Sequence, residues 1–164
     1  MKSWNYSNNG GYFITICTDK RKHILSKICV GDGFPVPQLT KKGQIVDDYI
    51  KNINLKYSCV TVSEYVVMPN HVHLLLSVVK DDGRGDPSPT VDTAMGWLKY
   101  QITKEINKVR NTKGEKIFQR SFHDHIVRNY DDYCEIRKYI HDNPIRWKYD
   151  KLYIDDSKEG ETHE

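Results

Sequence analysis

Two histidines inside one long apolar run have the spacing of a metal-ligand pair. The run Glu64–Val79 reads EYVVMPNHVHLLLSVV, and only the tripeptide MPN interrupts it. This interruption predicts a tight turn between two β-strands, the second of which carries His71 and His73. Because side chains alternate along a strand, both imidazoles should leave one face, with their Cα atoms roughly 7 Å apart. Such a pair can bind one divalent cation if another element supplies a third ligand.

The last predicted helix offers both an oxygen ligand and a nucleophile. Its apolar stripe is Tyr133, Ile136 and Ile140. At 100° per residue, Tyr139 and Asn143 fall together on one flank of that stripe, one turn apart. The amide oxygen of Asn143 would complete a ligand set for Mg²⁺ or Mn²⁺, and the phenol of Tyr139 would lie beside the cation. Two alternatives stay open: Asn143 only caps the helix, and Tyr139, one of eleven tyrosines, only packs.

Other polar residues form less specific patterns. His123 and His125 repeat the histidine spacing around a charged centre, which favours a structural or DNA-contacting role. A strip along the long helix combines an aromatic ring with cations one and two turns on, as suits single-stranded DNA. An ordinary solvated helix face explains the same strip. The expected DNA contacts on this strip and beside the second histidine pair are Trp97, Gln101, Lys104, Lys108, Arg120 and Arg128.

Periodicity predicts the elements that hold these residues. Between the two ends of the chain we expect the following: a strand over Gly11–Thr18, an irregular loop over Gly31–Pro37, a helix over Lys41–Asn52 capped by Thr40, a flexible connector over Lys80–Pro89, a helix over Thr90–Val109, and a strand over Ile117–Arg128 anchored by Phe122 and Ile126. The last helix should end at Asn143, because Pro144 disfavours helical geometry in the residue before it. The order is β-α-β-β-α-β plus a C-terminal helix. It indicates an α+β, ferredoxin-like (RRM-like) antiparallel sheet with helices on one face and the histidines near its centre.

Length and composition indicate the number of domains, the charge of a partner and the location of the protein. The 164 residues suit one domain, which we place at residues 1–149, followed by an acidic tail at 150–164 with two lysines against six acids. Residues 99–149 carry twelve Lys/Arg against seven acids, which favours a polyanionic partner. No apolar run reaches the ~18 residues of a membrane span, and no signal peptide begins the chain. We therefore expect a cytoplasmic protein whose four cysteines are reduced.

Three stretches carry a resemblance to a known family. YVVMPNHVHLLL, FQRSFHDHIVRN and YIHDNPIRW are similar to the REP-associated tyrosine transposases, single-tyrosine relatives of the HUH (His-hydrophobic-His) transposases and relaxases, and the likeness runs from GYFITICT to RWKYD. It implies a metal-dependent nuclease and strand transferase acting on single-stranded DNA near hairpins. It also implies that His71 and His73 hold the metal, that Tyr139 is the nucleophile, and that Asn143 completes the metal site. Members of this subgroup tend to be monomers, so a monomer is expected.

The implied reaction exchanges one phosphoester for another, so no nucleotide cofactor is needed. Two rival functions stay open. One is a non-catalytic module of the same fold that binds nucleic-acid hairpins. The other is a relaxase or replication initiator with the same chemistry, which the small size and the lack of a helicase region disfavour.

Overall fold

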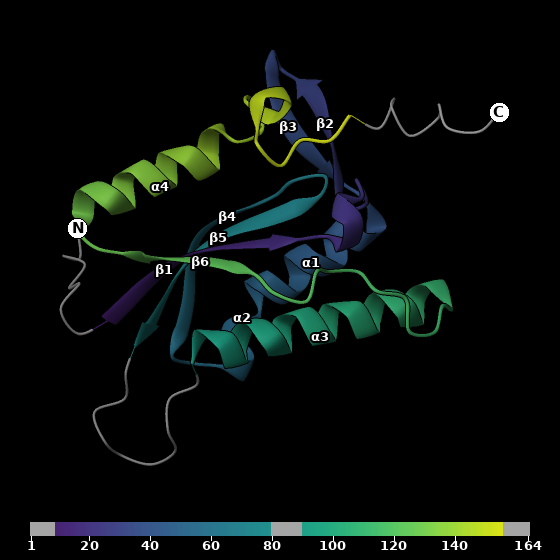
Figure 1. Cartoon of the computed structure of the whole chain (residues 1–164), viewed down its shortest axis with the longest axis horizontal. Coiled ribbons are helices and arrows are strands. Elements are labelled where there is room, and N and C mark those ends of the chain that lie inside the picture. Colours follow the sequence, from purple (N-terminus) through teal and green to yellow (C-terminus); the bar gives the residue numbers. More distant parts are fainter. Residues whose placement is uncertain (1–8, 80–89, 156–164) are drawn as a thin grey trace.

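A four-stranded antiparallel sheet forms the centre of the protein. The computed structural model describes residues 9–79 and 90–155. In this part of the chain the sheet has the strand order β4-β5-β1-β6 (Figure 1). The strands are β1 (Asn9–Cys17), β4 (Val60–Val67), β5 (His71–Val79) and β6 (His123–Val127), and the main helices are α1 (Lys41–Lys51), α3 (Val91–Arg110) and α4 (Tyr130–Asp142). The predicted β-α-β-β-α-β order and the ferredoxin-like fold class are confirmed, with β5 in the interior of the sheet.

Helices cover both faces of the sheet, whereas we expected them on one. The alternate residues Val72, Leu74 and Leu76 of β5 join the large core with α1 and α3. On the other face, Leu75 packs with Ile136 and neighbouring apolar residues of α4. Figure 1 shows α4 on one side of the sheet and α1 and α3 on the other. Helix α4 has an apolar stripe of its own, and it buries that stripe on the face of the sheet that α1 and α3 leave open.

The segment expected as an irregular loop is a β-hairpin. Strands β2 (Ser26–Gly31) and β3 (Phe34–Leu39) pair antiparallel. Asp32 and Gly33, both at positive φ (45° and 86°), form the turn between them. An Asp-Gly pair is the usual signal for such a turn. The prolines of β3 concealed the strand, although a two-stranded hairpin has free edges where proline is tolerated.

The helix α1 begins as predicted and packs very closely at its first turn. The Thr40 hydroxyl accepts a hydrogen bond from the Gly43 amide at 3.1 Å. It also donates to the Leu25 carbonyl at 3.0 Å. A Cβ built on Gly43 would lie 1.9 Å from that same carbonyl oxygen, so only glycine fits there.

The strand predicted over residues 117–128 is shorter in the structure. Regular pairing with β1 covers only β6, while Phe118 forms an isolated bridge to Thr18. The expected anchor Ile126 is 60% exposed, and its neighbour Val127 is buried instead. Because alternate residues of an edge strand face opposite sides, the packed residue is the one that faces α4.

Three further expectations concern the helix α3, the connector and the chain end. The end of the core stripe on α3 is exposed, since Val109 lies in its last turn at 57% exposure. The connector 80–89 lies outside the described residues.

The acidic tail does not begin at residue 150, because the side chain of Asp150 is 1% exposed and Leu152 is buried. Both pack against the domain, which therefore extends beyond the predicted boundary at residue 149.

Two composition-based expectations can be compared with the structure. All four cysteines are free thiols. Across the described ranges 9–79 and 90–155, no helix is long and apolar enough to span a bilayer.

Candidate metal and nucleophile site

The histidine pair lies in the interior of the molecule, on the sheet face that α4 covers. His71 and His73 are 0% and 2% exposed and occupy alternate positions of β5, as predicted. Cys17 lies opposite His71 in the register of β1, and Thr15 lies opposite His73. Both imidazoles are therefore held on rigid, paired strands near the centre of the sheet.

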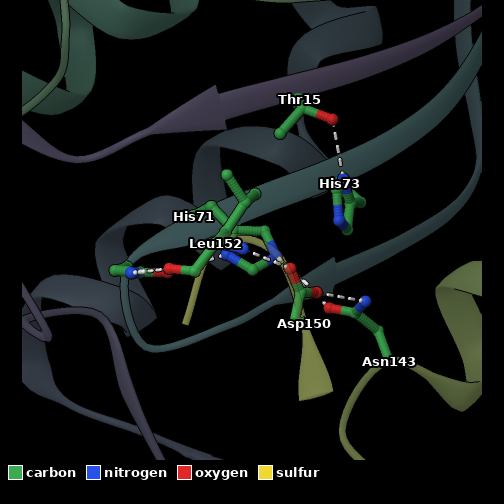
Figure 2. A network of polar contacts seen from close by, with 7 residues as sticks. Thr15, His71, His73, Asn143, Asp150 and Leu152 are labelled. Atoms are coloured by element: carbon green, nitrogen blue, oxygen red, sulfur yellow. Dashed lines mark hydrogen bonds and ion pairs between the residues drawn. The ribbon is translucent and has the colours of Figure 1, made fainter. Parts of the chain in front are cut away.

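One nitrogen of the His73 ring has no partner. Thr15 Oγ1 lies 2.8 Å from His73 Nδ1 (Figure 2). The other nitrogen, Nε2, is buried, and no hydrogen-bond partner for it exists among the residues that the structure describes. A buried polar atom without a partner is costly, and a bound cation would remove that cost.

Asn70 determines which nitrogen of His71 carries the proton. The Asn70 amide nitrogen donates to the Leu152 carbonyl at 2.8 Å, so its oxygen Oδ1 must be the atom that accepts. That oxygen lies 2.8 Å from His71 Nδ1, which must therefore be protonated. In a neutral imidazole the lone pair then belongs to Nε2, which faces the interior of the site.

Two oxygen-bearing side chains complete the cluster around His71 Nε2. Asn143 Oδ1 lies 3.2 Å from it, and Asp150 Oδ2 lies 4.0 Å from it. The Asn143 amide nitrogen donates to Asp150 Oδ2 at 2.9 Å, and this bond turns the amide oxygen toward the imidazole (Figure 2). Since Nε2 of the neutral ring and the amide oxygen are both acceptors, no proton joins them. A cation between them satisfies both.

Ligand atoms of His71, His73 and Asp150 lie within 4.8 Å of one another, which is compact enough for one metal ion. The donor set of imidazole nitrogens, a carboxylate and an amide oxygen suits a divalent cation. The structure thus brings together the two predicted histidines and Asn143, and it adds Asp150.

Burial keeps both histidines neutral. It lowers the pKa of His71 to about 4, although the Asp150 carboxylate, and the hydrogen bond that a protonated ring would donate to Asn143, act in the opposite direction. Burial, and then the neighbouring His71, lower the pKa of His73 well below its usual value. Neutral imidazoles are the form that binds metals, so the pair is ready for a metal at neutral pH.

Tyr139 lies at the open side of this cluster. Its ring centroid is 5.3 Å from that of His73 and 5.9 Å from that of Phe13, and the residue is 39% exposed. Burial and the nearby Asp150 raise its pKa, while the hydrogen bond with Asn143 lowers it. Without a cation the phenol is therefore protonated at neutral pH, and a bound cation would favour its ionisation.

Asn143 keeps helical geometry despite the proline that follows it, contrary to our expectation. Its φ and ψ are −57° and −43°, so the turn that starts at Tyr139 continues up to it. Pro144 is buried, and the chain then turns back through a short 3₁₀ helix at Trp147–Tyr149. This return places Asp150 beside Asn143.

Helical periodicity does not point to Asp150, because the helix ends before it. A carboxylate that follows a proline-terminated turn falls outside the spacing of that helix. The only available clue was that a histidine pair binding a divalent ion often includes a carboxylate.

The expected DNA contacts lie away from this cluster. The ring of Trp97 is packed against Tyr49 at 6.2 Å and Tyr57 at 5.7 Å, so it is not free to stack on a base. Gln101, Lys104 and Lys108 share its helix, α3, which covers the face opposite the histidines. A DNA-binding role for these three residues stays a prediction.

The two arginines that flank the second histidine pair lie before and after β6, and the Arg120 carbonyl accepts a hydrogen bond from Lys99 of α3 at 2.8 Å. Arg120 and Arg128 are exposed on either side of β6, and their DNA-binding role also stays a prediction. In the strand register, His123 lies opposite Thr15, which contacts His73 from the neighbouring strand. His125 is paired with Asp132 at 3.0 Å. The second pair thus borders the metal-ligand cluster without joining it.

Comparison with known proteins identifies the family. The family model of IS200-like transposases matches residues 7–143, most of the chain. The chain belongs to the IS200-like transposase family. Processing of DNA as a transposase is the role of that family.

Individual relatives agree with that assignment. An uncharacterised protein of Haemophilus influenzae is 30% identical over 94% of this chain and 91% of its own length. A candidate REP-associated tyrosine transposase of the same organism is 28% identical over 54% of this chain and 52% of its own length. A solved structure of a REP-associated tyrosine transposase bound to a REP hairpin has a TM-score of 0.56 at 21% identity, over 92% of this chain and 77% of that one. At that identity the structural match shows a common fold.

Proposed function

We propose that this family member is a metal-dependent endonuclease and strand transferase for single-stranded DNA, with Tyr139 as its nucleophile. The observation that carries the proposal is the contact between a half-exposed phenol and the ring of His73, whose buried Nε2 has no partner among the described residues. Few structural roles require a solvent-accessible tyrosine beside an imidazole nitrogen kept bare. A reaction in which a phenol attacks a metal-bound phosphate requires an accessible phenol, and it requires imidazole nitrogens that are free to bind the metal.

His71, His73 and Asp150 would hold the metal, and Asn143 would add its amide oxygen. We propose Mg²⁺ or Mn²⁺, since hard oxygen ligands complete the set and the substrate would add phosphate oxygens. When bound, the ion supplies electrostatic stabilisation of the charge that develops on the scissile phosphate.

The chain's own residues account for the remaining chemistry. Phe13 and His73 both contact the phenol ring of Tyr139, with centroids 5.9 and 5.3 Å away, and this packing restricts the directions from which the phenol oxygen can attack. The Tyr139 phenol loses its proton, and its oxygen forms a bond to phosphorus as the bond from phosphorus to the 3′ oxygen breaks. This step leaves the 5′ phosphate joined to the tyrosine, and the departing 3′ oxygen takes up one proton in place of the one that the phenol lost. Attack by another 3′-hydroxyl reverses the step and joins two strands, so no nucleotide cofactor is consumed.

A DNA hairpin near the cleavage site is the proposed context, by analogy with the REP hairpin bound to the structurally similar transposase. A monomer in the cytoplasm fits this proposal. A hairpin-binding module without cleavage is the alternative, and the assay below separates the two.

The test uses an end-labelled hairpin oligonucleotide with a single-stranded extension, incubated with the full chain and Mn²⁺ or Mg²⁺. We expect a covalent protein–DNA adduct on a denaturing gel, its loss in Tyr139→Phe, and its retention in Tyr149→Phe, which alters a tyrosine that is 91% exposed on the 3₁₀ helix. An adduct that persists in Tyr139→Phe contradicts the assigned nucleophile, and one that still forms after long dialysis against EDTA contradicts the metal. Salt-dependent binding without any adduct favours the binding module.

A further inference from the structure

Basic residues from three separate segments gather at the end of the molecule where α1 begins and α3 ends. Lys41, Lys42 and Arg110 line one cavity of about 370 Å³, and Lys116 lies 3.2 Å from Asp19. Figure 1 shows the turn after β1, the start of α1 and the end of α3 at this same end. We call it the basic end, and its basic residues are Lys20, Arg21, Lys22, Lys41, Lys42, Arg110, Lys113 and Lys116.

Local carboxylates neutralise only part of this charge. Residues 19–22, 41–42 and 110–116 contain eight Lys/Arg against two acids, a net charge of +6. The two acids are already engaged, since Glu115 pairs with Arg110 at 2.8 Å and Asp19 pairs with Lys116. Within the described part of the chain, no ion pair is formed by the exposed residues Lys20, Lys22, Lys41 and Lys113.

Like charges are close enough to affect one another. Burial, then the Arg110 guanidinium and to a smaller extent Lys22, lower the pKa of Lys42, and only Glu115 opposes them. Crowded cations destabilise the free protein through mutual repulsion. A polyanion placed across them would relieve that repulsion.

The turn that carries two of the basic residues is conformationally strained. Lys20 and Arg21 both have φ of 53°, the left-handed region that favours glycine. The Thr18 hydroxyl holds the turn by donating to the Lys22 carbonyl at 2.9 Å and to the Asn70 carbonyl at 3.1 Å. Residues kept in such a conformation are concentrated at functional sites. Here the two residues in the strained conformation both have cationic side chains, although glycine would adopt that conformation more easily.

The strained turn lies next to the metal-ligand cluster. It follows directly from β1, whose last residue Cys17 is opposite His71. At the start of the turn, the Thr18 amide donates to the carbonyl of Asn70, the neighbour of His71, at 2.9 Å. This turn, which carries Arg21, is therefore the part of the basic end that adjoins the cluster.

We propose that the basic end binds the double-stranded stem of a DNA hairpin, with the strand that leaves the stem passing Arg21 into the site. The identity of the DNA rests on the proposed function, whereas the location rests on the convergence of the three segments. Duplex DNA carries a negative charge about every 1.7 Å along its axis, so it matches a cluster of cations better than a single strand does.

The test measures binding of the full chain by fluorescence anisotropy over a range of KCl concentrations. The ligands are a DNA hairpin with a single-stranded extension, the extension alone, and an RNA hairpin of the same sequence. Lys22→Gln/Lys41→Gln removes two charges from the basic end. The matched control, Lys51→Gln/Lys56→Gln, removes two exposed lysines at the other end of α1 and on the short helix α2 (Ile53–Lys56).

We expect the basic-end variant to reduce the slope of log K against log[KCl] for the hairpin by about two and to weaken its binding roughly 30-fold at 0.15 M salt. Binding of the extension alone should change far less, and the control should bind the hairpin normally. Equal losses in the two variants, an equal loss on the extension alone, or an RNA hairpin bound as tightly as DNA would overturn the proposal. Thermal melting checks folding, and Lys41→Gln alone should give half the change in slope.

Failure of the two proposals can be told apart. At protein concentrations that saturate binding of the hairpin with its extension, the absence of a covalent adduct in the unaltered chain counts against the proposed chemistry. Anisotropy needs no cleavage, so it reports on the basic end in either case.

Discussion

Each imidazole of the cluster makes a hydrogen bond through Nδ1 and directs Nε2 into the site. Thr15 and Asn70 are the partners, and neither is a metal-ligand candidate itself. Such outer partners fix the ring orientation and the tautomer of ligating histidines. His71 and His73 were predictable as a ligand pair because they are two residues apart on one strand, a spacing that the sequence shows directly. Their partners were not, because Thr15 reaches His73 only through the pairing of distant strands.

Acid should destabilise the metal-free protein through these histidines. The pKa of His71 is about 4 in the folded chain, against an ordinary value of 6.5. Above pH 6.5 the ring is neutral in both the folded and the unfolded chain, so it does not change the free energy of unfolding there. Between pH 6.5 and 4 the unfolded chain binds the proton first, so the free energy of unfolding should fall by about 3 kcal/mol from His71 alone. His73 acts in the same direction.

Urea unfolding in metal-free buffer at several pH values measures this loss. His71→Gln should reduce the dependence on pH and leave the part that His73 contributes, whereas His141→Gln, which alters an exposed histidine of α4, should leave it unchanged. A dependence as steep in His71→Gln as in the unaltered chain would contradict the assignment.

At the scale of elements, α4 carries Tyr139, the proposed nucleophile, and is held to the sheet by apolar packing and by an ion pair. Ile136 and Ile140 are buried against the sheet, and Arg137 pairs with Glu64 of β4 at 2.7 Å. The helix and its apolar stripe were predictable from its 3.6-residue period. The face on which it packs was not, because the pattern of one helix does not record which side of the sheet is still uncovered.

The first turn of α1 should tolerate no side chain at Gly43. In Gly43→Ala the new methyl would collide with the Leu25 carbonyl, and we expect a loss of at least about 2 kcal/mol of stability. Leu25 also donates its amide to Pro69, in the turn before His71, at 3.0 Å, so metal affinity should fall as well. Chemical unfolding and metal titration measure the two effects.

Gly96→Ala in α3 is the matched control, because a Cβ there meets nothing within 4 Å. Alanine is the better helix former, so this variant should gain up to about 1 kcal/mol. Similar stability changes in the two variants would show that the close contact at Gly43 relaxes freely.

At the scale of the whole molecule, the chain reaches its functional arrangement by folding its C-terminal segment back onto the sheet. Asn70 joins this segment to the histidine strand through the Leu152 carbonyl, and Asp150 enters the ligand cluster. The overall β-α-β-β-α-β order could be predicted from the sequence. This return could not, because a stretch with excess acidic charge is typical of a solvated tail.

Truncation distinguishes the predicted domain end from the observed one. A chain that ends after residue 149 loses Asp150 and the buried Leu152, so we expect weaker Mn²⁺ binding and a loss of about 2 kcal/mol or more. A chain that ends after residue 155 keeps both and should match the full chain. Calorimetric titration with Mn²⁺ and chemical unfolding make the comparison, and equal behaviour of the two truncations would contradict a role for the segment 150–155.

The burial of the ligand atoms also has a kinetic consequence. With His71 and His73 at 0% and 2% exposure, a chelator such as EDTA could approach an ion in the cluster only from the open side, next to Tyr139. Because most of the ligand atoms are buried, removal of the ion by the chelator should be slow. Brief treatment with EDTA would then leave an active fraction, and long dialysis is the appropriate way to prepare the apo form.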